Sequence, residues 1–221
     1  MKTSKKIVLS VILAIISLLI LIFILIQISS STNSNTYKGF LTNLDLSVNS
    51  FMTKIENNFI TQLSTIIAFI FDTIILIIIT LIISIFLWLK NNKDNKKGPL
   101  LFVITILLTS GLIFLIKNLV QRARPLNSTV YETGFAFPSG HTTMSLVFFG
   151  VFTYLILLKN KSKPIKQTIL SISIFMIALI SFTRLYLNAH WLTDVLGGLA
   201  LGSFILIIFS IIYETLESKT S

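Results

Sequence analysis

Cysteine is absent from this chain of 221 residues, and histidine occurs only twice, at His141 and His190. The absence of cysteine excludes disulfides, thiolate metal sites and cysteine nucleophiles, and two histidines are too few for a histidine-rich metal centre. Acidic residues are also scarce, with eight Asp and Glu against eighteen Lys and Arg. In a soluble protein this excess of positive charge would suggest a nucleic-acid partner. Here the lysines cluster in short polar breaks between apolar runs, so membrane topology explains the charge better and no nucleic acid is expected as a partner.

Long apolar runs dominate the rest of the chain. The mean hydropathy is +0.90, and six runs approach or exceed the roughly 20 residues that a helix needs to cross a bilayer. The predicted spans are 7–28, 63–89, 100–116, 142–158, 165–182 and 192–213. Each must be helical because the hydrocarbon offers no water to satisfy peptide groups. The sequence therefore predicts an all-α polytopic membrane protein, one domain over residues 1–221 with six transmembrane helices in one bundle.

The first apolar run follows a basic start that would also suit a secretory signal peptide. The run is longer than the core of an ordinary signal peptide, and no obvious Ala-x-Ala cleavage site follows it. We therefore expect a retained membrane anchor, while the serines at 29–31 keep a cleaved signal as the alternative.

Basic residues are distributed unevenly between the two sides of the predicted membrane. If the N-terminus is cytoplasmic, twelve of the eighteen fall on the cytoplasmic side: Lys2, Lys5, Lys6, Lys90, Lys93, Lys96, Lys97, Lys159, Lys161, Lys163, Lys166 and Lys219. The other six are Lys38, Lys54, Lys117, Arg122, Arg124 and Arg184. This bias predicts a multi-pass protein of the cell membrane with both termini in the cytoplasm. The outer six include every arginine, which indicates a function other than topology.

Apolar residues recur at helical spacing between the first two spans, at Leu41, Leu44, Val48, Phe51 or Met52, Ile55 and Phe59. This spacing predicts an amphipathic helix that lies on the outer membrane interface. Packing of the same face against the spans would give the same pattern, so both placements stay open.

The first polar stretch at the outer end of a span runs from Lys117 to Pro125. Lys117 and Arg124 are seven residues apart, so they share one face if the third helix continues two turns beyond its apolar part. Two such cations can hold a phosphate, and Arg124 can bind two of its oxygens at once. Cations that only anchor the span at the interface would give the same pattern.

The second stretch is Phe-Pro-Ser-Gly-His at 137–141, directly before the fourth span. Ser139 suits an N-cap, so the N–H groups of Gly140 and His141 would point outward. Such a helix start binds anions, and Gly140 lets an anion approach closely. His141 would then be placed to donate a proton to a leaving oxygen. An ordinary turn followed by an interfacial histidine is the alternative.

The third stretch runs from Thr183 to Asp194. His190 and Asp194 are four residues apart and would be neighbours on one helical face. An aspartate that accepts from one ring nitrogen fixes the tautomer and leaves the other nitrogen free to attack. Arg184 adds a third cation near the same membrane depth. A His–Asp pair that only caps a helix is the alternative.

Each stretch alone allows a structural interpretation, but all three map to one membrane face. Together they supply charge neutralisation, a nucleophile, its orienting group and an acid for the leaving group. Phosphoryl transfer requires this set of groups. The sequence therefore predicts an active site at the extracytoplasmic face.

At these residues the chain resembles the type 2 phosphatidic acid phosphatase family, which shares its site design with the vanadium haloperoxidases. The family pattern is Lys-x6-Arg-Pro, then Pro-Ser-Gly-His, then Ser-Arg-x5-His-x3-Asp, and the motifs cover residues 117–194 here. The first two match in full. The third has Thr183 in place of its leading serine, which keeps a hydroxyl at that position.

The resemblance implies a role for each matching residue. His190 would attack phosphorus and form a phosphohistidine, Asp194 would hold its tautomer, and His141 would protonate the leaving oxygen and later help to activate water. The phosphoryl oxygens would be held by Lys117, Arg124, Ser139, Gly140 and Arg184. The family needs no metal ion, so neither a metal nor another cofactor is expected.

The predicted function is therefore hydrolysis of a lipid phosphomonoester or diphosphate in the membrane. Candidate substrates are phosphatidylglycerol phosphate, phosphatidic acid and undecaprenyl diphosphate. The alternatives are a lipid phosphotransferase of the same superfamily and a non-catalytic transporter or scaffold that only binds lipid phosphate. A haloperoxidase is not expected because those relatives are soluble. The sequence does not indicate an oligomeric state.

A few further residues need an interpretation. Asp72 lies inside the predicted second span, where an ionisable residue is a functional candidate by default. We leave it outside the catalytic set, because a protonated or helix-bonded aspartate explains it as well. Gly198 and Gly202 form a small-xxx-small pair that is expected to serve helix packing. Three residues flank the motifs and are expected to have no role in the headgroup pocket: Glu132, Asn188 and Trp191.

Overall fold

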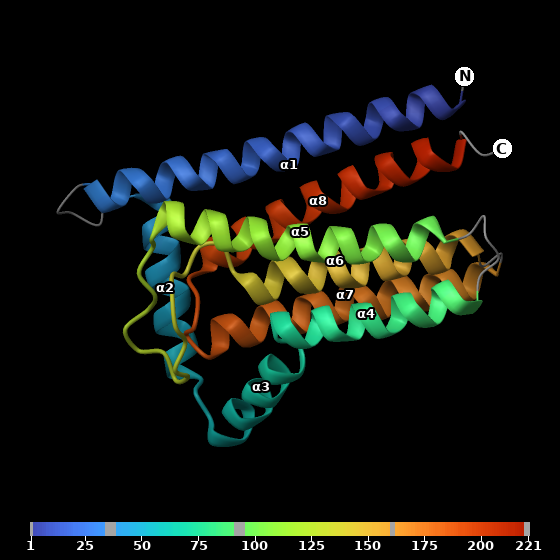
Figure 1. Cartoon of the computed structure of the whole chain (residues 1–221). Coiled ribbons are helices and arrows are strands. Elements are labelled where there is room, and N and C mark those ends of the chain that lie inside the picture. Colours follow the sequence, from blue (N-terminus) through green and yellow to red (C-terminus); the bar gives the residue numbers. More distant parts are fainter. Residues whose placement is uncertain (1, 34–38, 91–95, 160–161, 219–221) are drawn as a thin grey trace.

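A computed structural model describes residues 2–33, 39–90, 96–159 and 162–218. These residues form helices and connecting loops (Figure 1). The helices are α1 (Lys2–Asn33), α2 (Phe40–Lys54), α3 (Asn58–Ile70), α4 (Thr73–Lys90), α5 (Lys97–Val120), α6 (Gly140–Lys159), α7 (Lys163–Tyr186) and α8 (Leu192–Ser218). Within the described ranges, six of them are long and apolar enough to cross a membrane: α1 and α4 to α8. The predicted all-α fold with six transmembrane helices is confirmed.

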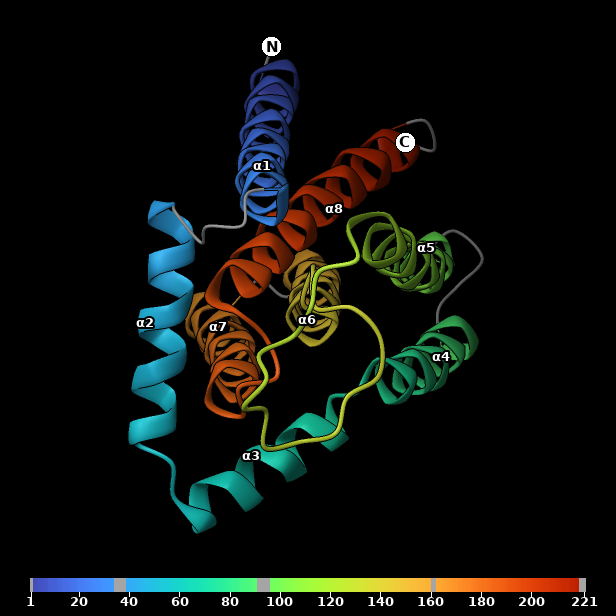
Figure 2. The same cartoon turned by 90° about the vertical axis from the view of Figure 1, so that its left-hand side faces the viewer.

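Helix α6 lies at the centre of the bundle. Seen from the end, it is surrounded by α4, α5, α7 and α8, and α1 lies outside this ring against α8 (Figure 2). Of the residues in its most apolar stretch, 61% are buried inside the bundle, whereas the corresponding share for α4 is 17%. The most buried of the six spans is therefore the one that begins at the predicted anion site.

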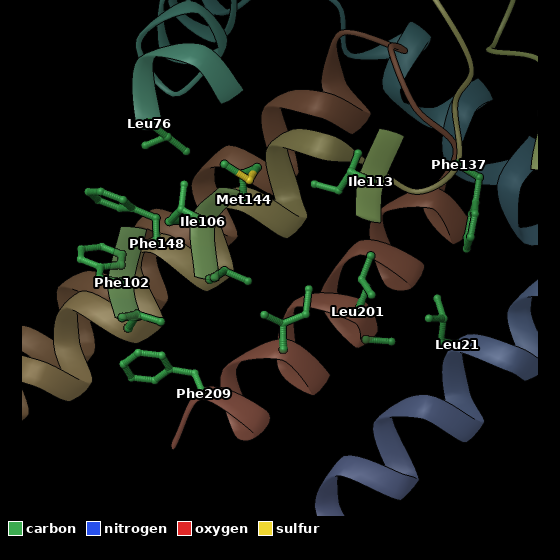
Figure 3. Close-up of a cluster of buried hydrophobic side chains, with 14 of the residues drawn as sticks. Leu21, Leu76, Phe102, Ile106, Ile113, Phe137, Met144, Phe148, Leu201 and Phe209 are labelled. Atoms are coloured by element: carbon green, nitrogen blue, oxygen red, sulfur yellow. The ribbon is translucent and has the colours of Figure 1, made fainter. Parts of the chain in front are cut away.

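Apolar side chains from several helices meet along the bundle axis (Figure 3). Leu76 of α4, Phe102 and Ile106 of α5, and Met144 of α6 are almost completely buried in this cluster. Two glycines bring α8 close to α6, as predicted. A Cβ at Gly198 would lie 3.0 Å from the Ser139 carbonyl oxygen, and one at Gly202 would lie 3.2 Å from Leu146 Cβ. The close contact ties the start of α8 to the start of α6.

The second span differs from its prediction as one helix over 63–89. The chain breaks at residues 71–72 into α3 and α4. Asp72 causes the new start, because its Oδ1 accepts the N–H of Ile74 at 2.9 Å, as a helix N-cap does. The prediction that Asp72 lies inside a span is therefore wrong, since it lies at the end of one.

Helix α2 is the predicted amphipathic helix between the first two spans. It lies across the end of the bundle at a steep angle to the spans (Figure 1). Its inner face buries Asp45 and Met52, and it packs against α7 and α8. Of the two residues considered for one apolar position, Met52 is buried and Phe51 is exposed. The structure thus confirms packing of this helix against the spans, and its position at the membrane interface stays a prediction.

The two ends of the bundle differ in what they carry. Helix α1 starts and α8 ends at one end, while α2, α3 and the loop 121–139 lie at the other, which we call the loop end (Figure 1). All three predicted motif stretches lie at the loop end. Of the residues counted for topology, Lys38, Lys93, Lys161 and Lys219 lie outside the described residues. The orientation of the two ends in the membrane stays a prediction.

Candidate active site

Lys117 and Arg124 come together, but not on one helical face. They would share one face only if the helix continued two turns beyond its apolar part, and α5 ends at Val120, before Arg124. Arg124 lies instead in the loop 121–139, which folds back over the helix end. Lys117 Nζ donates to the carbonyl oxygen of Phe135 at 2.5 Å, and Arg124 Nη2 donates to the same oxygen at 3.4 Å. The loop therefore brings the two cations to one point.

The His190 ring lies beside the Arg124 guanidinium. Arg124 Nη1 is 3.3 Å from His190 Nε2, and a guanidinium can only donate, so Nε2 is the accepting nitrogen. The neutral ring then carries its proton on Nδ1. Burial, followed by the positive charges of Arg184, Arg124 and Lys117, holds the pKa of His190 well below its usual range. At neutral pH the ring is uncharged, and the lone pair on Nε2 faces the cations.

Asp194 lies on the Nδ1 side of the same ring. Its Oδ2 is 3.5 Å from His190 Nδ1 and accepts the backbone N–H of Trp191 at 2.8 Å. Helix α8 begins at Leu192, so His190 precedes the helix and the pair does not share a continuous helical face. Asp194 caps the helix start and also faces the histidine. The separation of 3.5 Å is long for a hydrogen bond, so the two groups are in contact without a hydrogen bond between them.

The start of α6 points to the same place. Ser139 is completely buried, its N–H donates to the Asp194 carbonyl oxygen at 3.0 Å, and its Oγ accepts from Thr142 Oγ1 at 3.1 Å. A Cβ built on Gly140 would meet its nearest neighbours only at ordinary distances, 3.7 Å from Ile113 and 3.8 Å from Thr73. Crowding by these neighbours therefore does not require a glycine here, whereas close approach of an anion to the helix start would.

His141 reaches from α6 toward α3. Its Nε2 lies 3.0 Å from the Ala68 carbonyl oxygen and 3.9 Å from Asp72 Oδ2. A carbonyl oxygen only accepts, so Nε2 carries the proton in this contact. The break between α3 and α4 thus places two acceptors beside the predicted general acid.

Glu132 lies between two of the predicted phosphate-binding arginines. Its Oε1 forms an ion pair with Arg184, which is 1% exposed, and its Oε2 lies 3.4 Å from Arg124 Nη2. Burial alone would raise the pKa of Glu132, but the charges of Arg184, His141 and Arg124 lower it below its usual value. The expectation that Glu132 is only a neighbour of the site is therefore wrong. Its carboxylate contacts both guanidinium groups that are predicted to hold a phosphate.

The remaining flanking residues have structural contacts. Asn188 takes a left-handed conformation with φ of 49°, and its Oδ1 accepts from Asn49 of α2 at 2.8 Å. Trp191 donates through its indole N–H to the Ala123 carbonyl oxygen at 2.9 Å. Thr183, which stands where the family has serine, donates to a carbonyl oxygen of its own helix. These contacts fix the ends of α7 and α8.

Two residues of the site had no predicted role. The sequence assigns Arg122 only to the basic residues of the outer side and assigns no role to Asp45. Arg122 donates to Asp194 Oδ1 at 2.5 Å and to Asp45 Oδ2 at 2.7 Å. A signal for Asp45 was available, since it has the helical spacing of Leu41, Val48 and Met52. A charge on the apolar face of a helix indicates a buried partner.

Within the described ranges, no three His, Cys, Asp or Glu side chains lie together as a set of metal ligands. The predicted independence from metal ions can be tested by measuring activity in EDTA.

Comparison with known proteins identifies the family of this chain. A family model described as PAP2 superfamily matches residues 98–218. The chain belongs to this superfamily. Phosphatidylglycerophosphatase B of Bacillus subtilis (strain 168) is 36% identical over 90 residues. That alignment spans 39% of this chain and 44% of the relative, so the chain matches less than half of the relative's length.

Two solved structures share the fold. The crystal structure of the first transmembrane PAP2 type phosphatidylglycerolphosphate phosphatase from Bacillus subtilis has a TM-score of 0.76 and 22% identity, and the match covers 90% of this chain and 96% of that chain. Aquifex aeolicus LpxE has a TM-score of 0.59 and 21% identity, with coverage of 75% and 93%. The match to the Bacillus subtilis structure covers 90% of this chain, so it includes most of the residues that precede the family-model region 98–218.

Proposed function

We propose that this protein is a membrane lipid phosphatase that hydrolyses a lipid phosphomonoester or diphosphate through a phosphohistidine at His190. The observation that carries this proposal is the state of the His190 ring. Its unprotonated Nε2 faces Arg124, while Nδ1 faces the Asp194 carboxylate. A nucleophilic nitrogen is thus held inside a cluster of cations that attracts a phosphate.

In the first step, the lone pair of His190 Nε2 attacks phosphorus. The new P–N bond forms as the P–O bond to the leaving group breaks, and the positive charge on the ring is stabilised by Asp194. Catalysis then depends mainly on position and charge. Lys117, Arg124 and Arg184 neutralise the phosphoryl oxygens, and the start of α6 at Ser139 and Gly140 adds backbone N–H groups. The phosphate must displace Glu132 from the two arginines.

Protons are moved by His141. It gives a proton to the leaving oxygen in the first step. In the second step it takes a proton from the water that attacks the phosphohistidine, so that the P–N bond breaks and inorganic phosphate leaves. A residue that acts as acid in one step and base in the next returns to its starting state after each turnover.

The substrate is an amphiphile, because the site lies at the end of a membrane bundle. We propose that the loop end faces the extracytoplasmic side, in agreement with the positive-inside bias. Both the curated relative and one solved structure are named for phosphatidylglycerol phosphate. This lipid is therefore the first substrate to test, followed by phosphatidic acid and undecaprenyl diphosphate.

The test is release of inorganic phosphate by purified protein from these three lipids in EDTA, without an added acceptor. We expect release that vanadate inhibits, loss of release in His190→Ala, and a trapped phosphorylated protein that is stable in base and labile in acid. Activity that requires a metal ion, or full turnover by His190→Ala, would contradict the proposal. Release only after an acceptor alcohol is added would favour a phosphotransferase. Lipid binding with no turnover would favour a transporter or scaffold.

A further inference from the structure

We infer that Asp45 and Arg122 are positioning residues for the catalytic pair, and that α2 is therefore part of the working site. This inference rests on the proposed function, because it concerns the orientation of Asp194 toward the His190 nucleophile. Helix α2 lies outside residues 98–218, to which the superfamily model extends. The known motifs therefore do not include this contribution.

Asp45 caps helix α8 from another helix. Its Oδ1 accepts the backbone N–H of Thr193 at 2.8 Å, and its Oδ2 accepts the Thr193 hydroxyl at 2.7 Å. The first N–H groups of a helix have no partner within it, and a carboxylate there also complements the helix dipole. Asp45 is 3% exposed, so these bonds lie away from solvent. Helix α2 thus fixes the first turn of α8, which carries Asp194.

Arg122 joins this cap to the catalytic carboxylate. One guanidinium nitrogen, Nη1, donates to Asp194 Oδ1 at 2.5 Å, and the other, Nη2, donates to Asp45 Oδ2 at 2.7 Å. The same Nη1 donates to the Thr193 hydroxyl at 2.6 Å. The planar fork of arginine suits two carboxylates at once, whereas a lysine offers a single charged centre. The indole ring of Trp191 lies 5.7 Å from the Arg122 guanidinium carbon and covers it.

These contacts determine which way the Asp194 carboxylate faces. Its Oδ1 is held by Arg122, and its Oδ2 is held by the Trp191 N–H on the side of His190 Nδ1. Without Arg122, the Trp191 N–H still holds Oδ2, but Oδ1 loses its donor and the buried negative charge loses the cation bonded to it. The phosphate-binding cations are other residues, namely Lys117, Arg124 and Arg184. Loss of Asp45 or Arg122 is therefore expected to slow the chemical step more than it weakens phosphate binding.

The experiment compares Asp45→Asn, Arg122→Gln and Arg122→Lys with wild type and with the control Glu56→Gln. Glu56 is an exposed acid that follows α2, so the control removes the same charge at the same end of the bundle. Misplacement of a reacting group by about 1 Å costs on the order of 100-fold in rate. We expect kcat to fall about 10- to 100-fold in Asp45→Asn and Arg122→Gln, with KM and the vanadate inhibition constant within about threefold of wild type. Arg122→Lys should recover part of kcat, and Glu56→Gln should match wild type.

Several outcomes would overturn the inference. Wild-type kcat in Asp45→Asn and Arg122→Gln would show that the network is dispensable. A parallel loss of kcat, vanadate binding and detergent-solubilised thermal stability would assign it a purely structural role. His190→Ala in the same assay separates this inference from the proposed function. If His190→Ala is inactive while Asp45→Asn is fully active, only the positioning role fails, whereas an active His190→Ala contradicts the proposed function itself.

Discussion

The two regions of the chain contribute to the site in different ways. The C-terminal region, residues 98–218, carries every motif residue, from Lys117 to Asp194. The N-terminal region, residues 2–33 and 39–90, carries none of them. Nevertheless, Asp45 of α2 is linked to Asp194 through Arg122, and the Ala68 carbonyl oxygen of α3 contacts His141 directly. One region of the chain can thus carry the candidate reacting groups while another region fixes their positions. Substitutions in the C-terminal region should then have the larger effects.

Asp194→Asn is expected to have the largest effect of the predictions below. The amide can still accept the Trp191 N–H, but it no longer carries the charge that stabilises the His190 ring as it becomes positive. In the analogous pair of a serine protease, this substitution lowers kcat about 10⁴-fold. Phosphate release and melting temperature should be measured together, and we expect lost turnover in a folded protein. Retention of more than a tenth of wild-type kcat would remove Asp194 from the catalytic set.

His141→Ala is expected to lower kcat by about 10²- to 10⁴-fold, the usual contribution of a general acid. The loss should depend on the leaving group, because a phenolate leaves readily without a proton and an alkoxide does not. An aryl phosphate and an alkyl phosphate should therefore be compared in wild type and variant. If both substrates lose the same factor, His141 has a role other than protonation of the leaving group.

Glu132→Gln tests whether every charge at the candidate site promotes turnover. The carboxylate contacts Arg184 and Arg124, so its neutralisation should free both guanidinium groups for an anion. We expect vanadate to bind about three- to tenfold more tightly, equivalent to about 1 kcal/mol. Competition against a fluorescent lipid phosphate measures this constant. Weaker vanadate binding would mean that Glu132 positions the arginines rather than competing with phosphate.

Asp72→Asn should have the smallest effect. The side chain is 42% exposed and lies 3.9 Å from His141 Nε2, so its charge acts over distance and is screened by solvent. Asparagine caps a helix as well as aspartate does, so the start of α4 should be preserved. We expect kcat to fall no more than about threefold. Asp72→Ala also removes the cap, and a much larger loss in that variant alone would assign Asp72 to structure.

The sequence was sufficient to predict the spans and the motif residues for specific reasons. Uncharged runs of bilayer length can only be helices, and this identified all six spans, although the second was placed about ten residues too early. His190 and Asp194 are close in the chain, so their proximity followed from spacing. The start of α6 followed from a proline, a serine and a glycine, which are local signals. Each of these predictions depends on residues that are near one another in sequence.

The contacts that the sequence did not predict join residues that are far apart in the chain. Arg124 reaches the site because the loop 121–139 folds back, and a helix that ends at Val120 gives no local sign of that path. Glu132 lies between two arginines for the same reason. The contact of His141 with Ala68 exists only because a cap at Asp72 divides the second span into two helices. A backbone carbonyl oxygen gives no sequence signal of its partner.

The sequence by itself determined the fold class, because hydrophobic length is a local property, and residue chemistry indicated the candidate reacting groups. Only the tertiary structure decided how those groups are held. It showed that His190 Nε2 faces Arg124, that Glu132 contacts Arg184 and Arg124, and that Arg122 joins Asp194 to Asp45. These decisions depend on distances between separate helices and loops, and such distances are set by packing of the whole bundle.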